Sequence, residues 1–201
     1  RDQALAVSGL LSSKMYGPPV NPPQPQLGVK AAFGGGIDWQ TSTGEDKYRR
    51  GLYTMWRRSN PYPSMATFDA PNRETCTLKR DRTNTPLQAL VTLNDPVYIE
   101  AAVSLAGRIL REGGTTDSER AHYGMRCVLG RPASETEIAR IVRLRDQAFE
   151  RFQSEPKLAE QFVKDRPSTM ELPPNIKPDE LAAWTLVCNI LLNLDEALMK
   201  R

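Results

Sequence analysis

Two acidic residues near the middle of the chain, Asp69 and Glu74, could act as a general acid–base pair. Paired carboxylates transfer protons or hydrolyse glycosidic bonds when a fold holds them close together. Arg73, Arg80 and Arg82 lie beside them in the sequence, so the carboxylates could instead form structural ion pairs. Both interpretations stay open, because spacing along an irregular segment does not give the distance between two side chains.

The same segment is also a candidate anion-binding site. Its arginines are followed by the hydrogen-bonding side chains of Thr83 and Asn84, directly before a predicted helix start at Thr85. Backbone N–H groups at a helix N-terminus attract sulfate, phosphate or carboxylate, and guanidinium groups bind such anions through two hydrogen bonds. Plain capping of the helix is the alternative interpretation. The candidate ligand-binding residues are Arg73, Arg80, Arg82, Thr83 and Asn84.

Positive charge is concentrated around this segment. Between residues 47 and 94 there are nine cations and three anions, an excess of six, whereas the whole chain carries a net charge of +3. Binding to a single-stranded nucleic acid would also need exposed aromatic side chains among the cations. We expect Tyr53, Trp56 and Phe68 to be buried, which does not favour nucleic acid.

Metal and haem sites find little support in the sequence. The cysteines Cys76, Cys127 and Cys188 form no CxxC or CxxCH motif, and the single histidine is His122. We therefore expect no metal site and no cofactor in this chain, while the pairing of the cysteines stays open. No apolar run reaches the roughly 18 residues that a membrane-spanning helix needs, so we expect no membrane span.

The pattern of residues predicts a mainly α protein that forms a single domain over residues 1–201. Residues 1–14 resemble the remnant of a helix, and 15–47 form a connector rich in proline and glycine. Residues 48–84 are expected to be an ordered basic loop layer, and 85–201 a helical bundle. The stretch 48–58 fits both a strand and a helix, which allows one short strand pair.

Capping residues mark four helix starts in the predicted bundle, and two of them are Thr-Pro or Asp-Pro pairs. A short helix is expected over 157–165, and a last helix from Asp179 to the end of the chain at Arg201. The segment from Ser64 to Arg82 is expected to be irregular but ordered. The four helix starts are Thr85, Asp95, Thr116 and Ser134, and the first helix should bury Leu87, Leu90, Val91 and Leu93.

The order FDAPNRETCTLKRDRTNTPLQALVTLNDP, from Phe68 to Pro96, resembles the planctomycete-type C-terminal domain of unknown function, domain-of-unknown-function family 1553. Three further stretches extend this resemblance over essentially the whole chain: RRGLYTMW at 49–56, LGRPASETE at 129–137 and WTLVCNILLNLDE at 184–196. The opening RDQALAVSGLL is similar to a stretch inside that domain. We therefore expect part of the domain, within a multidomain protein, to precede Arg1.

The resemblance implies a setting more than a mechanism, and it carries no catalytic residues. Family members occur in large, exported planctomycete proteins, often beside a cytochrome c domain, so any haem would belong to another domain. The resemblance thus implies an extracytoplasmic interaction or ligand-binding module, whether periplasmic or secreted. Its partners would be other domains of the same polypeptide and an acidic or sulfated polysaccharide. The alternatives are a carbohydrate-active hydrolase that uses Asp69 and Glu74, and a nucleic-acid-binding module.

Overall fold

The computed structural model describes residues 1–24, 39–57, 61–72, 74–81, 83–164, 166–167, 170 and 172–199. In these ranges the chain forms nine α-helices and two 3-10 helices. The only β-type pairing among the described residues is an isolated bridge between Val20 and Thr54. The prediction of a mainly α protein is confirmed, and the short strand pair is reduced to this one bridge.

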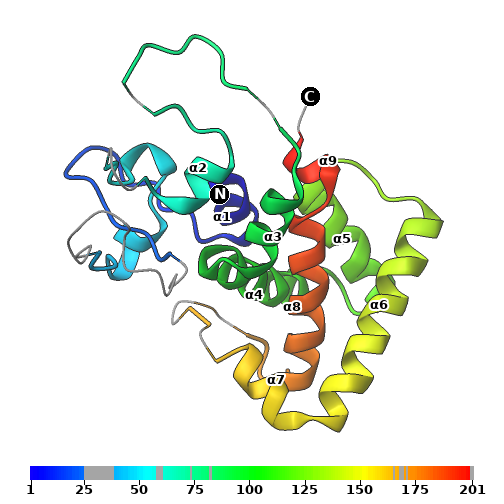
Figure 1. The fold of residues 1–201 in the computed structure, drawn as a ribbon. Coiled ribbons are helices and arrows are strands. Elements are labelled where there is room, and N and C mark those ends of the chain that lie inside the picture. Colours follow the sequence, from blue (N-terminus) through cyan, green and yellow to red (C-terminus); the bar gives the residue numbers. More distant parts are fainter. Residues whose placement is uncertain are drawn as a thin grey trace.

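The elements follow one another from a short N-terminal helix, through an irregular layer, to a bundle of longer helices. Figure 1 shows η1 and η2 (cyan) on one side of this bundle, with α6 on the opposite side. The elements are α1 Asp2–Ser8, η1 Gly44–Tyr48, η2 Gly51–Tyr53, α2 Pro63–Thr67, α3 Pro86–Asn94, α4 Pro96–Glu112, α5 Asp117–Leu129, α6 Glu135–Ser154, α7 Pro156–Phe162, α8 Pro178–Leu192 and α9 Asp195–Leu198.

The core is centred on α8, which packs against α4 and α6. Alanines occur at the buried positions of both α4 and α8, among them Ala101, Ala102, Ala182 and Ala183. Such small side chains let two helix axes approach closely. Trp184 is completely buried in α8 and is the largest such side chain. α8 is apolar on nearly all sides, as expected of a helix that its neighbours surround.

The four predicted helix starts are confirmed. The side chains of Thr85, Thr116 and Ser134 each accept a hydrogen bond from the backbone N–H three residues on, and a Gln or Glu there completes a capping box. The side chain of Asp95 accepts a hydrogen bond from the backbone N–H of Val97 at the start of α4. These caps satisfy N–H groups that have no partner within the helix.

Two predicted helix ends are wrong, and one short helix was not predicted. The first helix ends at Ser8, not near residue 14, because Gly9 adopts a left-handed backbone (φ 82°) and its N–H bonds back to Ala6. The last long helix ends at Leu192 and is followed by the separate helix α9, so it does not continue to residue 201. The segment after Asn60, expected to be irregular, contains the short helix α2, which begins at Pro63.

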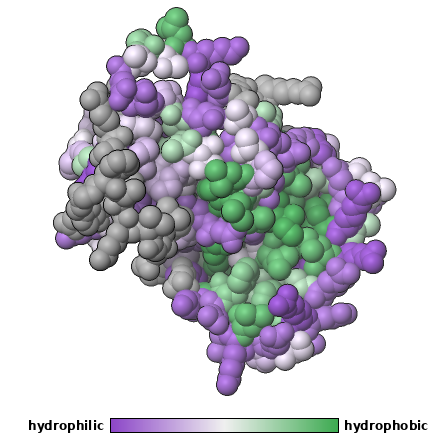
Figure 2. All heavy atoms as spheres, viewed as in Figure 1, coloured by the Kyte–Doolittle hydropathy of each residue, from purple (hydrophilic) through white to green (hydrophobic). Residues whose placement is uncertain are grey.

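The predicted inner face of α3 is wrong for two of its four residues, since Val91 and Leu93 are half-buried and Val91 packs against the core. Leu87 and Leu90 are more than half exposed, and the residues that α3 buries are Gln88 and Thr92. Figure 2 shows apolar side chains gathered on the surface over α3 and α8. The reason is that α3 rests on polar groups: the Thr92 hydroxyl donates to the Asn193 side chain, and Gln88 bonds the segment before the helix.

Candidate functional site

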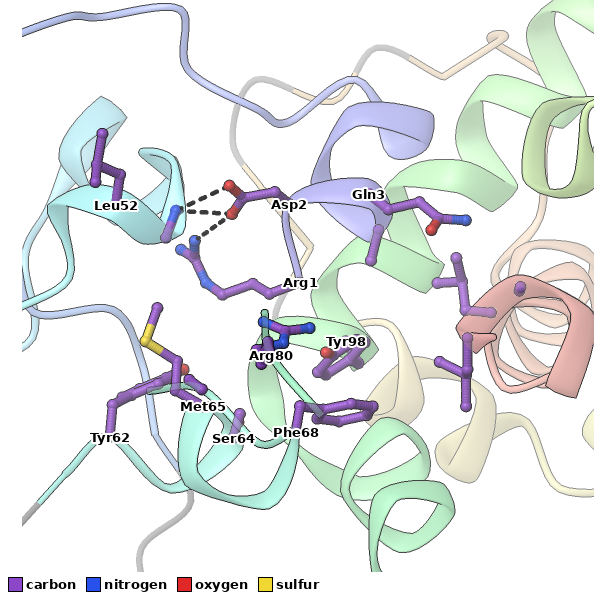
Figure 3. Close-up of a pocket in the computed structure, with 16 residues that line it drawn as sticks. Arg1, Asp2, Gln3, Leu52, Tyr62, Ser64, Met65, Phe68, Arg80 and Tyr98 are labelled. Atoms are coloured by element: carbon purple, nitrogen blue, oxygen red, sulfur yellow. Dashed lines mark hydrogen bonds and ion pairs between the residues drawn. The ribbon is translucent and has the colours of Figure 1, made fainter. Parts of the chain in front are cut away.

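A cavity of about 460 Å³ lies where α1, α2, η2 and the first turn of α4 meet the end of α8 and α9 (Figure 3). We call it the α2 cavity. Its polar wall is made by Arg1, Asp2, Ser64 and Arg80. Its apolar wall is made by Met65, Phe68, Leu192 and Leu198. A concave site with apolar walls and a few polar groups is typical of ligand-binding pockets.

A buried carboxylate fixes the floor of the α2 cavity. Asp95 is almost fully buried, with one oxygen bonded by the backbone N–H of Val97 (2.9 Å) and the other by the Ser64 hydroxyl. The N-terminus of α4 is therefore joined to α2 through one side chain. Burial raises the pKa of Asp95, although these hydrogen bonds act in the opposite direction. Burial likewise raises the pKa of Tyr98, whose ring stacks on Phe68 with a centroid distance of 6.4 Å.

The opposite wall is held by the start of the chain. The guanidinium of Arg1 donates to the backbone carbonyls of Arg49 (2.8 Å) and Lys47 (3.1 Å). The carboxylate of Asp2 accepts the backbone N–H of Gly51 at 2.8 and 3.0 Å. A side chain at Gly51 would meet the terminal methyl of Met65 at 3.0 Å and the Asp2 carboxylate at 3.3 Å, so the glycine allows this close approach without displacing them. These contacts tie α1 to the segment of η1 and η2.

Arg80 contributes a cation to the α2 cavity, and none of the described residues forms an ion pair with it. It comes from the exposed loop between α2 and α3, and its guanidinium lies beside Tyr98 and Arg1 in Figure 3. Within the described part of the chain, Arg80 forms no ion pair and no hydrogen bond with another side chain. A guanidinium carries five donors and stays charged at any physiological pH, so it can bind a carboxylate or sulfate that enters the cavity.

Of the predicted site residues, Asp69, Thr83 and Asn84 have structural contacts. The carboxylate of Asp69 accepts the backbone N–H of Thr83 at 3.2 Å and its hydroxyl at 2.5 Å, which closes the base of the loop from residue 70 to 82. The amide of Asn84 donates to Asp195 at 2.9 Å. Asp69 also adopts a left-handed backbone (φ 55°), consistent with a tight turn at this base. None of the three lines the α2 cavity.

The other predicted site residues lie along the loop itself. Glu74 is exposed, and its backbone N–H bonds the side chain of Asn72 at 3.0 Å. Arg73 and Arg82 lie outside the described residues. Arg80 is thus the predicted ligand-binding residue that lines the α2 cavity.

The cluster of cations that the sequence indicates is divided in the structure. Arg49 is 1% exposed, and its guanidinium donates to the carbonyls of Tyr16 and Pro18 and lies over the ring of Tyr53, 3.8 Å from the centroid. Lys47 forms an ion pair of 2.6 Å with Glu100. The charge excess of the segment therefore overstates the cationic surface that a ligand could reach.

The aromatic residues of this segment are less buried than expected. Tyr53, Trp56 and Phe68 are half-buried, so the expectation that they are buried is only partly met. The rings of Tyr53 and Phe68 pack on Arg49 and Tyr98.

Three residues that line the α2 cavity or hold the elements around it were not predicted as parts of a site. Gln88 was recognisable only as the third residue of a capping box, and Asp95 only as a cap. Ser64 carries no signal in the sequence, because its role depends on a partner 31 residues away.

Within the described residues, no group of three or more His, Cys, Asp or Glu side chains is arranged to hold a metal ion. No helix in the same ranges is both long enough and apolar enough to cross a membrane.

Comparison with known protein families identifies the family of this chain. A family model described as a protein of unknown function, PSD1 (DUF1553), matches residues 1–145. The chain belongs to this family. No curated protein and no solved structure matches it. The matched residues include every polar residue of the α2 cavity, whereas α7, α8 and α9 lie beyond the match.

Proposed function

We propose that this DUF1553 domain is a ligand-binding module, and that the α2 cavity binds an anionic group of the ligand. The observation that supports this proposal is the guanidinium of Arg80, which forms no ion pair with the described residues, at a cavity with aromatic and aliphatic walls. A charge of this kind gains most from a ligand that brings the opposite charge, because a charge-assisted hydrogen bond is about twice as strong as a neutral one.

The ligand that we propose is an acidic or sulfated polysaccharide. This choice rests on the setting that the family resemblance implies, an extracytoplasmic multidomain protein of a planctomycete or a related bacterium. Other domains of the same polypeptide would be the remaining partners. The apolar wall at Met65 and Phe68 could hold the C–H face of a sugar ring, while Arg80 binds its acidic substituent.

Retention on immobilised heparin tests the proposal, with Arg80→Ala as the variant and Lys79→Ala as a matched control. Lys79 is exposed, carries the same charge and lies one residue away, but does not line the α2 cavity. We expect Arg80→Ala to elute at clearly lower salt than Lys79→Ala, and Lys79→Ala to elute close to the wild-type protein. Equal elution of the two variants would show that only the net charge matters, and the proposal would fail.

The two alternative functions remain predictions without support from a specific contact. A hydrolase would need Asp69 and Glu74 to face a pocket, whereas Asp69 accepts hydrogen bonds from Thr83 and Gln88 and Glu74 lies on the exposed loop. A nucleic-acid-binding module would need a continuous cationic surface, and two cations of the segment, Lys47 and Arg49, are used inside the protein.

A further inference from the structure

A second and larger cavity, of about 1170 Å³, lies on the other side of α4 from the core. We call it the α4 cavity. One face of α4 lines it through Pro96, Ile99, Glu100 and Val103, which follow one another at helical spacing. The remaining walls come from residues 9–13, from η1, and from the described residues of the segment after α7. Its volume exceeds that of a typical small-molecule site, so it has room for more than one sugar-sized ring.

The central polar group of this cavity is the carboxylate of Glu100, which is 8% exposed. The ammonium of Lys47 donates to Glu100 Oε1 at 2.6 Å, and the hydroxyl of Tyr48 donates to the same oxygen at 2.7 Å. Two donors on one oxygen hold the carboxylate in a fixed orientation. Burial, and then the hydrogen bond to Glu100, raises the pKa of Tyr48, so this hydroxyl remains a donor.

The second oxygen, Glu100 Oε2, is available to a ligand. No described residue donates a hydrogen bond to it. The residue lines the α4 cavity, so we infer that a ligand there can reach this oxygen. A fixed carboxylate oxygen that faces a cavity is a strong acceptor for a hydroxyl donor.

The rim of the α4 cavity has the opposite charge. Lys164 and Arg166, in the segment after α7, are exposed and line the cavity. Neither forms an ion pair with another residue in the described part of the chain. Phe162, Ile99 and Val103 supply apolar surface at the same cavity. The cavity thus combines the Glu100 acceptor, apolar surface and these two exposed cations. A second carboxylate, Glu45, also lines it and accepts a hydrogen bond from the Ser12 hydroxyl.

We propose that the α4 cavity binds a sugar acid, that is, a hydroxylated ring that carries a carboxylate or sulfate. The ring hydroxyls donate to Glu100 Oε2, the C–H surface of the ring packs on the apolar residues, and the acidic group binds Arg166 and Lys164. A neutral sugar leaves the two cations without a partner. A bare anion leaves the Glu100 acceptor unused and gains nothing from the apolar surface. This site is separate from the α2 cavity and does not depend on the function proposed for it.

A titration followed by amide NMR shifts tests this site, with D-glucuronate as the probe and D-glucose and sodium sulfate as comparisons. We expect glucuronate to give saturable shifts at residues 99–103 and 162–167, with glucose and sulfate each at least about tenfold weaker, the effect of one lost charge-assisted contact. Equal shifts with sulfate would reveal a general anion site, and equal shifts with glucose a general sugar site. Either result, or no shift at all, would overturn the proposal.

Two variants and a control complete the test. Arg166→Ala removes an exposed side chain and should leave the fold intact, so we expect about tenfold weaker glucuronate binding. Arg140→Ala, an exposed arginine of α6 outside both cavities, should bind as the wild-type protein does. Glu100→Gln should also weaken binding, and its amide spectrum shows whether it is folded. Unchanged affinity in Arg166→Ala contradicts the proposal whatever Glu100→Gln does. Arg80→Ala should leave this titration unchanged, which separates the two cavities.

Discussion

The polar inner face of α3 leads to a sharp prediction about stability. Gln88 is 2% exposed. Its amide donates to the carbonyl of Thr67 (3.0 Å) and to the hydroxyl of Thr83 (2.8 Å). Its carbonyl oxygen accepts the backbone N–H of Thr85 at 3.2 Å. One side chain therefore joins the end of α2, the base of the exposed loop and the start of α3.

Gln88→Met keeps the length of this side chain and removes these three hydrogen bonds, together with a longer one to Asp69 (3.5 Å). Each such bond contributes about 1 kcal/mol net, and a buried donor or acceptor left without a partner costs about 1–3 kcal/mol. Because methionine fills a similar volume and gains from burial, part of this loss is offset. We expect the free energy of unfolding to fall by about 2–4 kcal/mol. In urea, with a slope of about 2 kcal/mol per molar, the midpoint should fall by roughly 1–2 M.

The control is Gln147→Met, the same substitution at an exposed position of α6. Surface changes of this kind stay within about 0.5 kcal/mol. Urea unfolding followed by helical circular dichroism measures both variants. If Gln88→Met is as stable as Gln147→Met, then the polar contacts of α3 do not hold the loop layer to the bundle, and our explanation of why α3 buries polar residues is refuted.

Three further predictions concern single residues and are measured by urea unfolding. Asp95→Ala should cost about 2–3 kcal/mol through the lost cap and the lost Ser64 contact, whereas Asp95→Asn should cost less than about 1 kcal/mol, because asparagine also caps and avoids a buried charge. The hydrogen bond from Arg131 lowers the pKa of Glu137 to about 2, below its unfolded value near 4.3. Its stabilisation is therefore complete above about pH 5 and is lost as pH falls towards 2, so Glu137→Gln should flatten this acid-side decline. Gly130→Ala should cost about 1 kcal/mol from its left-handed backbone alone, because a side chain there meets open space.

The helix starts were predictable because their signals are local. A capping residue and its partner lie within four residues of each other, so Thr116 and Glu119 specify the start of α5 without reference to the rest of the fold. The same holds for Ser134 and Glu137 at α6. The end of α1 was harder to predict from the sequence. Gly9 ends the helix, but several residues after it also suit a helix.

The orientation of α3 could not be predicted from its sequence. Leu87 and Leu90 indicate an apolar inner face, and burial of leucine is the usual outcome. The structure buries Gln88 and Thr92 instead, because distant groups supply their partners: Thr67 lies 21 residues before Gln88, and Asn193 lies 101 residues after Thr92. Periodicity describes one helix and contains no information about the polarity of the surface on which it packs.

The candidate site was predictable only in part, for the same reason. Local charge drew attention to Arg80, which does line the α2 cavity. The same local charge includes Arg49, whose guanidinium is buried against backbone carbonyls, and the candidate Asp69 has a carboxylate that closes a loop. Whether a charged side chain serves the fold or a ligand depends on which backbone groups lie around it, and only the folded chain shows this.

The most direct test of the central claim is isothermal titration of a sulfated heparin hexasaccharide into the wild-type protein, Arg80→Ala and Lys79→Ala at one salt concentration. The account predicts that Arg80→Ala binds about tenfold more weakly than the wild-type protein, the effect of one lost charge-assisted contact. Lys79→Ala should lose less than about threefold, since an exposed charge outside the cavity is screened by salt. Equal losses in the two variants, or no binding by the wild-type protein, would contradict the claim that the α2 cavity holds the anionic group.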